Sequence, residues 1–76
     1  MVNNKMTNSA KLKGKMIESG LNQTLVAEQL GMTIATFNYK VNNKTEFKAN
    51  EIKKLSEILH LTNDEVNTIF FADKVE

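Results

Sequence analysis

Apolar residues recur three and four positions apart in five short segments of this chain, and no segment alternates between apolar and polar residues. Spacing of this kind places the apolar side chains on one face of a helix, whereas a half-buried strand needs a period of two. The chain contains no proline, so none of the segments is interrupted by a helix breaker. The pattern predicts an all-α protein built from five short helices.

The length of the chain limits how these helices can be assembled. Its 76 residues leave room for one small domain and none for a second core. Cysteine is absent, so helix packing must support the fold without disulfides or thiolate metal sites. We expect a flexible N-terminal arm over residues 1–8, a compact five-helix domain over 9–71 and a C-terminal tail over 72–76.

The predicted helices start and end at residues that suit those places. Asn22 and Thr33 are good N-caps, and Thr62 begins a capping box with Glu65. His60 follows a predicted helix end, where a left-handed conformation is expected of it rather than metal binding. Only three residues separate the second helix from the third, so these two should cross steeply. The predicted helices cover residues 9–20, 23–30, 34–42, about 50–59, and 62 onward.

The apolar stripes also predict the core. Ile17 is expected beside the buried stripe of the first helix, and close backbone packing would explain Gly14 inside that helix. Phe47 interrupts a polar loop and is expected to anchor it. The other predicted core residues are Leu12, Met16, Val26, Ala27, Leu30, Met32, Phe37, Val41, Ile52, Leu55, Ile58, Leu59, Val66 and Ile69.

The functional signal lies in residues 23–41. Within it, the small residue Ala27 is expected where two helices touch, and Gly31 is expected where the chain reverses its direction. Phe37 is expected on the buried side of the next helix. With Gln23 at its start, this stretch resembles the helix-turn-helix of the lambda-repressor-like (Cro/repressor) family of phage and bacterial regulators, over residues 9–71. In that family the second helix of the motif enters the major groove. The resemblance implies a sequence-specific double-stranded DNA-binding regulator, similar to small Cro-like repressors.

The third predicted helix has a small, uncharged outer face. With Phe37 and Val41 turned inward, Ala35, Asn38 and Tyr39 point outward. A merely solvated helix would more often carry Lys and Glu there, although solvent exposure alone remains the competing interpretation of these side chains. The residues expected to face base edges are Thr33, Ile34, Ala35, Thr36, Asn38 and Tyr39.

The residue types on that face favour A·T base pairs. Asn38 can pair bidentately with adenine, and Ala35, Thr36 or Ile34 can contact a thymine methyl group. The chain contains no Arg, so only Lys40 or Lys44 can approach guanine, and then as point charges. We expect a DNA site with A·T at most specified positions.

The resemblance also implies a set of phosphate contacts. It places Gln23 on a phosphate, although this residue also suits the first position of a helix, and it places Lys44 and Lys48 in a loop that touches the DNA backbone. Residues 1–48 carry a net charge of +4 and residues 49–76 one of −3, which is compatible with a polyanion-facing side. The full set of expected phosphate contacts is Asn22, Gln23, Asn42, Asn43, Lys44, Lys48 and Lys11.

The end of the third helix departs from the family pattern. The apolar role shifts from the position of Lys40 to Val41. Asn43 replaces a frequent glycine, and asparagine is the next most tolerant residue for a left-handed backbone. Lys48 stands where a Ser or Thr cap is usual, so the fourth helix should start poorly capped, or only at Asn50.

A homodimer is expected, because one recognition helix reads too few base pairs to define a site. Phe70 and Phe71 are neighbours on the last helix and cannot both face one core. We therefore predict a dimer interface made of Ile69, Phe70 and Phe71. The alternative is a protein-interaction module, such as an antitoxin or anti-regulator, that uses the same fold on a protein partner.

Other classes of function are not favoured. There is no Cys nucleophile, no phosphate-binding glycine loop and only one His, so neither an enzyme nor a metal or cofactor site is expected. No apolar run reaches the length of a membrane span, and residues 1–9 lack the apolar core of a signal peptide. A cytoplasmic protein without a small-molecule ligand is expected.

Overall fold

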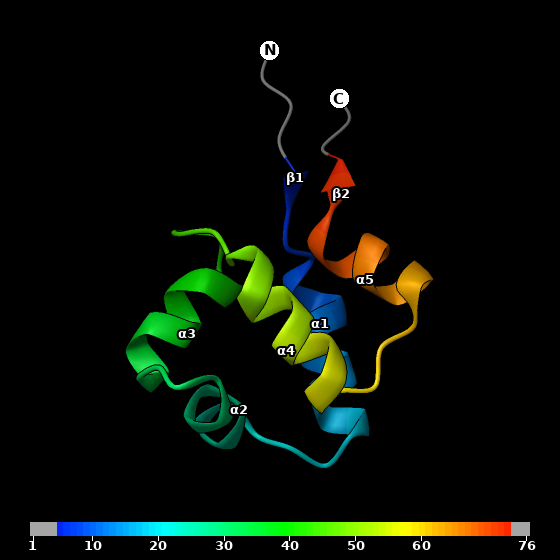
Figure 1. Cartoon of the computed structure of the whole chain (residues 1–76). Helices are drawn as coiled ribbons and strands as arrows, with labels where there is room; N and C mark the ends of the chain where they lie inside the picture. The colour runs from blue at the N-terminus through cyan, green and yellow to red at the C-terminus, as the bar shows by residue number, and fades with distance from the viewer. Residues whose placement is uncertain (1–4, 74–76) are drawn as a thin grey trace.

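The computed structural model describes residues 5–73, with side chains from residue 7 to residue 71. Over this range the chain forms five helices and one short pair of strands, and the predicted all-α, five-helix fold is confirmed. Figure 1 shows the helices grouped around one centre, with the two strands side by side at one end. The elements are β1 (Lys5–Met6), α1 (Ser9–Glu18), α2 (Gln23–Leu30), α3 (Ile34–Val41), α4 (Ala49–Ile58), α5 (Asn63–Phe70) and β2 (Ala72–Asp73). None of these helices is long and apolar enough to cross a membrane.

Side-chain caps close the starts of the helices where the sequence predicts them. At α2 and α3, the side-chain oxygens of Asn22 and Thr33 accept hydrogen bonds from the backbone amide three residues further on. At α5, Glu65 donates its amide to the Thr62 hydroxyl and its carboxylate accepts from the Thr62 amide, which completes the predicted capping box. These bonds satisfy amides that have no partner within the helix, and so they favour helix starts at these residues.

The ends of α1 to α4 share one backbone motif. In each of them a residue one or two positions past the helix has a positive φ. The amide of the next residue donates to the carbonyl five residues before it. This is a Schellman motif, in which the left-handed residue lets the chain turn back over the helix end. The left-handed residues are Gly20, Gly31, Asn43 and His60, with φ of 74°, 76°, 64° and 55°. The left-handed conformation predicted for Asn43 and His60 is confirmed.

Three aromatic rings lie at the centre of the core. Phe47 packs edge-to-face against Phe37 and Phe70, with ring centroids 6.0 and 5.5 Å apart. The predicted anchoring of the loop by Phe47 is therefore confirmed. The buried hydrophobic residues are Leu12, Met16, Val26, Ala27, Phe37, Val41, Phe47, Ile52, Leu55, Leu59, Ile69 and Phe70, and the partly buried ones packed against them are Leu21, Leu30, Met32, Ile58, Leu61 and Val66.

Two predictions about α1 are wrong. Ile17 is 78% exposed. Only Leu12 and Met16, which lie one turn apart on the same face of α1, are buried in the core, and Ile17 points away from that face. Gly14 is not closely packed: a Cβ built on it has no neighbouring atom within 4 Å. It lies instead at a groove of about 440 Å³ between α1 and α5.

The ends of the described chain are part of the fold. β1 pairs with β2 in antiparallel register, with Lys5 opposite Asp73 and Met6 opposite Ala72. Residues 5–8 are thus attached to the domain, unlike the flexible arm predicted over 1–8, and 72–73 are paired instead of forming a tail. Strands of two residues are too short for alternation to mark them in the sequence. The rest of the predicted arm and tail lies outside the described residues.

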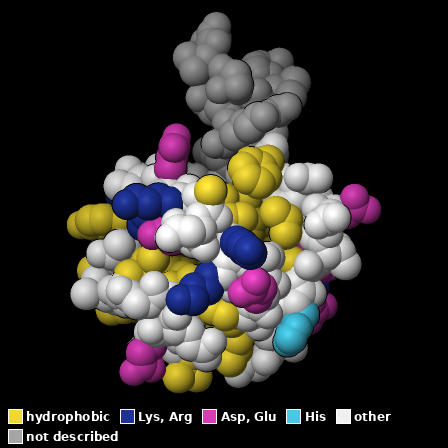
Figure 2. All heavy atoms as spheres, in the orientation of Figure 1, with side chains coloured by type: hydrophobic (Ala, Val, Ile, Leu, Met, Phe, Trp, Pro, Cys, Tyr) yellow, Lys and Arg dark blue, Asp and Glu magenta, His cyan; other side chains and the backbone are white. Residues whose placement is uncertain are grey.

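The exposed side of α4 carries charges of both signs. Lys53, Lys54 and Glu57 are all exposed on this helix. In Figure 2, which has the orientation of Figure 1, basic and acidic side chains lie next to one another near the centre of the view. This face therefore does not present the single sign of charge that favours a polyanion.

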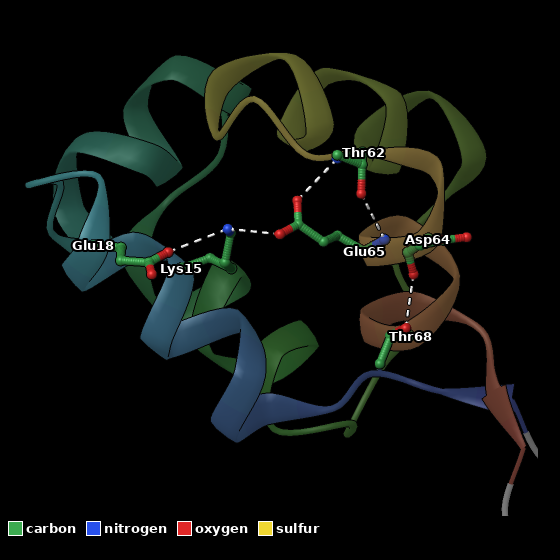
Figure 3. A network of polar contacts seen from close by, with 6 residues as sticks. All are labelled: Lys15, Glu18, Thr62, Asp64, Glu65 and Thr68. Carbon is green, nitrogen blue, oxygen red and sulfur yellow. Dashed lines mark hydrogen bonds and ion pairs between the residues drawn. The ribbon is translucent and has the colours of Figure 1, made fainter.

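A polar network joins α1 to α5 on another side of the molecule (Figure 3). The Lys15 ammonium lies 2.8 Å from a carboxylate oxygen of Glu65 and 3.1 Å from one of Glu18. Hydrogen bonds to Glu65 and then to Glu18 raise the pKa of Lys15 above its ordinary value. The bond from Lys15, followed by that from the Thr62 amide, lowers the pKa of Glu65. The network links the second turn of α1 to the capping box of α5.

Candidate nucleic-acid interface

The pair α2–α3 forms a helix-turn-helix. The two helices are joined by Gly31, Met32 and Thr33 only, and the left-handed Gly31 reverses the chain. Figure 1 shows α3 crossing α2 steeply, as the short connection predicts. Val26 and Ala27 of α2 are buried against the core, so the pair is fixed from its inner side. One face of α3 is left on the surface.

That free face of α3 has the composition predicted for it. Phe37 and Val41 are fully buried, which fixes the rotation of the helix about its axis. On the opposite side Ala35 and Thr36 are exposed, and Tyr39 is 56% exposed. Of the remaining residues expected at base edges, Thr33 and Ile34 are exposed and Asn38 is half-buried. The structure therefore brings all six predicted base-facing residues to one helix and its cap.

Part of the polar capacity of this face is used within the chain. The Thr33 hydroxyl accepts the Thr36 amide and also lies 3.1 Å from the Thr36 hydroxyl. This mutual bond holds both hydroxyls at the N-terminal end of α3. The side chains of Asn38 and Tyr39 make no hydrogen bond among the residues that the structure describes, so their polar groups remain open to a ligand.

The starts of the first three helices differ in charge from those of the last two. The first turns of α1, α2 and α3 contain no acidic residue. By contrast, Glu51 lies in the first turn of α4, and Asp64 and Glu65 lie in that of α5. An acidic side chain neutralises the partial positive charge of a helix N-terminus, and its absence leaves that charge available to an anion.

Most residues predicted to contact phosphates are accessible. Lys11, Lys44, Lys48 and Asn42 are exposed. Asn22 is exposed as well, but its side-chain oxygen caps α2, which leaves only its NH₂ group to donate outward. Gln23 is half-buried at the first position of α2.

Asn43 has a structural role that the sequence does not indicate. Its side-chain oxygen accepts the Thr7 amide and its NH₂ group donates to the Thr7 carbonyl, both at 2.9 Å. These bonds use the oxygen and one N–H, and the second N–H of this exposed side chain is left to donate outward. Its partner is 36 residues away in sequence, so no local pattern indicates the bond.

Burial removes Lys40 from the possible DNA contacts. Its side chain is buried, and the ammonium lies 2.9 Å from a Glu51 carboxylate oxygen and 3.2 Å from the Glu46 carbonyl oxygen. The expectation that Lys40 can approach guanine is therefore wrong, and of the two lysines considered only Lys44 is exposed. The sequence signal for this pair is weak, because a lysine in an amphipathic helix is normally placed on the surface.

Glu51 also explains the start of α4. The helix begins at Ala49 and not at Asn50, and the Lys48 side chain forms no cap, as expected. The Glu51 carboxylate instead accepts the Lys48 amide at 2.9 Å. Burial alone would raise the pKa of Glu51, but the bonds from the Lys48 amide and the Lys40 ammonium outweigh burial and hold the pKa below its ordinary value.

The predicted dimer interface is mostly internal. Ile69 and Phe70 are buried in the core of the single chain, so they cannot form a surface for a second copy. Phe70 faces inward because its ring packs on Phe47. Phe71, one position further round the helix, is 43% exposed and is the one member of the predicted set on the surface.

The fold and this face define a small, all-α helix-turn-helix domain. Comparison with family models gives the particular family: the model described as "Protein of unknown function (DUF739)" matches residues 6–73. The chain belongs to this family, and the matched region includes all five helices. No curated protein matches the chain.

Proposed function

We propose that this protein is a sequence-specific regulator that binds double-stranded DNA with α3 in the major groove. The single observation that supports this most is the free face of α3, where residues 33–39 are exposed or half-buried around a buried Phe37 and none is charged. Small side chains allow a helix to approach base edges closely, and uncharged polar groups can exchange hydrogen bonds with them. The resemblance to lambda-repressor-like regulators points to the same use of the helix.

Phosphate contacts flank this face in the proposed mode of binding. Exposed Lys44 and Lys48 follow α3 in the chain, and the N-terminal ends of α2 and α3 have no acidic residue to repel a phosphate. Such contacts fix the orientation of a protein on DNA without reading sequence. Asn38 and Tyr39 would then supply hydrogen bonds to bases, with Ala35 and Ile34 against thymine methyl groups.

A second copy of the chain completes the proposal. Two recognition helices on half-sites about 34 Å apart would define a longer site than one can. Phe71 is an exposed aromatic residue, outside the face of α3, that is available for such a dimer. We expect the preferred DNA to be rich in A·T at the specified positions, since the chain offers no Arg to guanine.

The test is selection of bound duplexes from a random library at two salt concentrations, followed by affinity measurements on the selected site. Lys44→Ala should weaken binding to all duplexes alike and reduce the slope of log K against log salt by about one. Asn38→Ala should cost about 1–3 kcal/mol on the selected site and relax the preference at one position. Lys53→Ala is the matched control, because Lys53 is an exposed lysine on the mixed-charge side of α4.

Two results would reject the proposal. One is the absence of duplex binding even at low salt, which would favour the protein-interaction module instead. The other is an equal loss of affinity from Lys44→Ala and Lys53→Ala, since binding would then depend on charge alone and not on the face of α3. A selected site dominated by G·C would contradict the base preference while leaving DNA binding intact.

A further inference from the structure

Residues 5–9 form a strap that is bonded alternately to two distant parts of the fold. Met6 pairs with Ala72 of β2, and the Asn8 amide donates to the Ile69 carbonyl of α5. Residues 7 and 9 are bonded to the end of α3 instead: the Thr7 backbone bonds to the Asn43 side chain, and the Ser9 hydroxyl donates to the Val41 carbonyl. The strap therefore ties the C-terminal part of the domain to the end of α3.

Asn43 is the centre of the attachment to α3. It is the left-handed residue of the Schellman motif there, and its amide donates to the Lys40 carbonyl. The amide of the next residue, Lys44, donates to the Tyr39 carbonyl at 2.8 Å. The two side-chain bonds from Asn43 to Thr7 thus hold the residue that directly precedes Lys44 and sets the direction in which the chain leaves α3.

The other three Schellman motifs are fixed in a different way. After each of their left-handed residues comes an apolar side chain that packs partly buried on the core: Leu21, Met32 and Leu61. This hydrophobic contact commonly accompanies the motif. At α3 the same position is occupied by exposed Lys44, so that contact is lost. The bonds between Asn43 and Thr7 take its place and leave a cationic side chain on the surface.

We infer that Asn43 is a positioning residue, which acts through its bonds to Thr7 to hold Lys44 in place for a DNA phosphate. The inference rests on the proposed function for its ligand. This role does not require Asn43 itself to touch DNA, because it depends on the two bonds to the Thr7 backbone. Ordering Lys44 in advance reduces the conformational entropy lost when it binds, and the gain appears as affinity.

The substitution Asn43→Gly isolates this role. Glycine accepts a φ of 64° without strain, so the variant keeps the backbone turn and loses only the two side-chain bonds. A double-mutant cycle with Lys44→Ala on duplex affinity then measures whether the two residues act together. Asn67→Gly, at an exposed position within α5, is the control for a loss of stability that leaves the two bonds between Asn43 and Thr7 in place.

We expect Asn43→Gly to weaken duplex binding about fivefold, and Lys44→Ala to have a clearly smaller effect in the Asn43→Gly background than in the natural chain. Asn67→Gly should leave the affinity of the folded protein unchanged. In the absence of DNA, hydrogen exchange at the Lys44 amide should be faster in Asn43→Gly and unchanged in Asn67→Gly.

Additive effects of Asn43→Gly and Lys44→Ala, or a loss of affinity equal to that of Asn67→Gly, would overturn the inference. Unchanged exchange at the Lys44 amide would also overturn it, and that result needs no DNA. If the natural chain binds no duplex while exchange at Lys44 responds to Asn43→Gly, the proposed function fails and the positioning of Lys44 by the strap stands.

Discussion

Lys40 of α3 and Glu51 of α4 form a buried ion pair, with 2.9 Å between the ammonium nitrogen and the nearer carboxylate oxygen. The side chains are only 9% and 17% exposed. Glu51 also accepts the Lys48 amide, and Lys40 also donates to the Glu46 carbonyl. The pair therefore joins the end of α3, the loop after it and the start of α4. Both charged groups also form a hydrogen bond to the backbone.

The first prediction concerns the stability contributed by this pair. Lys40→Met should lower the free energy of unfolding by about 2–3 kcal/mol, because it leaves the Glu51 carboxylate buried without its cation. The double variant Lys40→Met with Glu51→Gln should recover part of that loss, since glutamine is uncharged and still accepts the Lys48 amide. Urea denaturation of the three proteins measures this, and a double variant less stable than Lys40→Met would contradict it.

The second prediction is a loss of stability at acid pH. The pKa values of Glu51 and Glu65 are both lowered from 4.5 in the folded chain. A group with a lowered pKa stabilises the fold fully above its unfolded value, and that contribution is lost as the pH falls through the folded value. The free energy of unfolding should therefore decrease below about pH 4.5, and Glu65→Gln should reduce this dependence.

At alkaline pH the sign is reversed for Lys15, whose pKa is raised from 10.5. Its contribution is complete below that value and is lost as the pH rises above it. Thermal unfolding followed from acid to alkaline pH checks both sides. An acid limb with the same slope in Glu65→Gln and in the natural chain would show that the network of Figure 3 is not its source.

The third prediction separates two glycines. Gly14→Ala should raise the free energy of unfolding by up to about 1 kcal/mol, because the position is helical and the added methyl group meets no atom within 4 Å. Gly31→Ala should lower it by about 1 kcal/mol or more, since φ there is 76°. Denaturation midpoints that shift in the same direction for both variants would contradict this assignment.

The fourth prediction separates two neighbouring aromatic residues. Phe70→Leu should cost about 1–2 kcal/mol, because the buried ring packs on Phe47, whereas Phe71→Leu should change stability by only about 0.5 kcal/mol. If the proposed dimer uses Phe71, Phe71→Ser should weaken self-association in sedimentation experiments without unfolding the chain. Self-association that is unaffected by Phe71→Ser would place the dimer interface elsewhere.

Local features of this fold could be predicted from the sequence. N-caps such as Asn22 and the left-handed residues Asn43 and His60 act within one turn of the chain, so their residue types are enough to indicate them. The burial of Phe37 and Val41 followed from their spacing, and with it the outward face of α3. The spacing of apolar residues gives a wrong prediction for Ile17. It is predicted beside the buried stripe of α1, but its side chain lies in solvent.

Features that depend on distant partners could not be predicted in the same way. The burial of Lys40 requires Glu51, which comes from the next helix, and the bonds of Asn43 require a backbone 36 residues earlier. Both residues are polar and lie at the end of α3. They matter for function because both have structural roles, and burial removes Lys40 from the possible DNA contacts.

The strap also bears on the order in which the domain folds and opens. Its bonds from Thr7 to Asn43 and from Ser9 to Val41 close segments of 36 and 32 residues, whereas the caps and Schellman motifs close only a few. Contacts that close long segments lose more chain entropy and form later. Release of the strap with the helices still formed requires only these few bonds to break, so it should be among the least costly partial openings of the native protein.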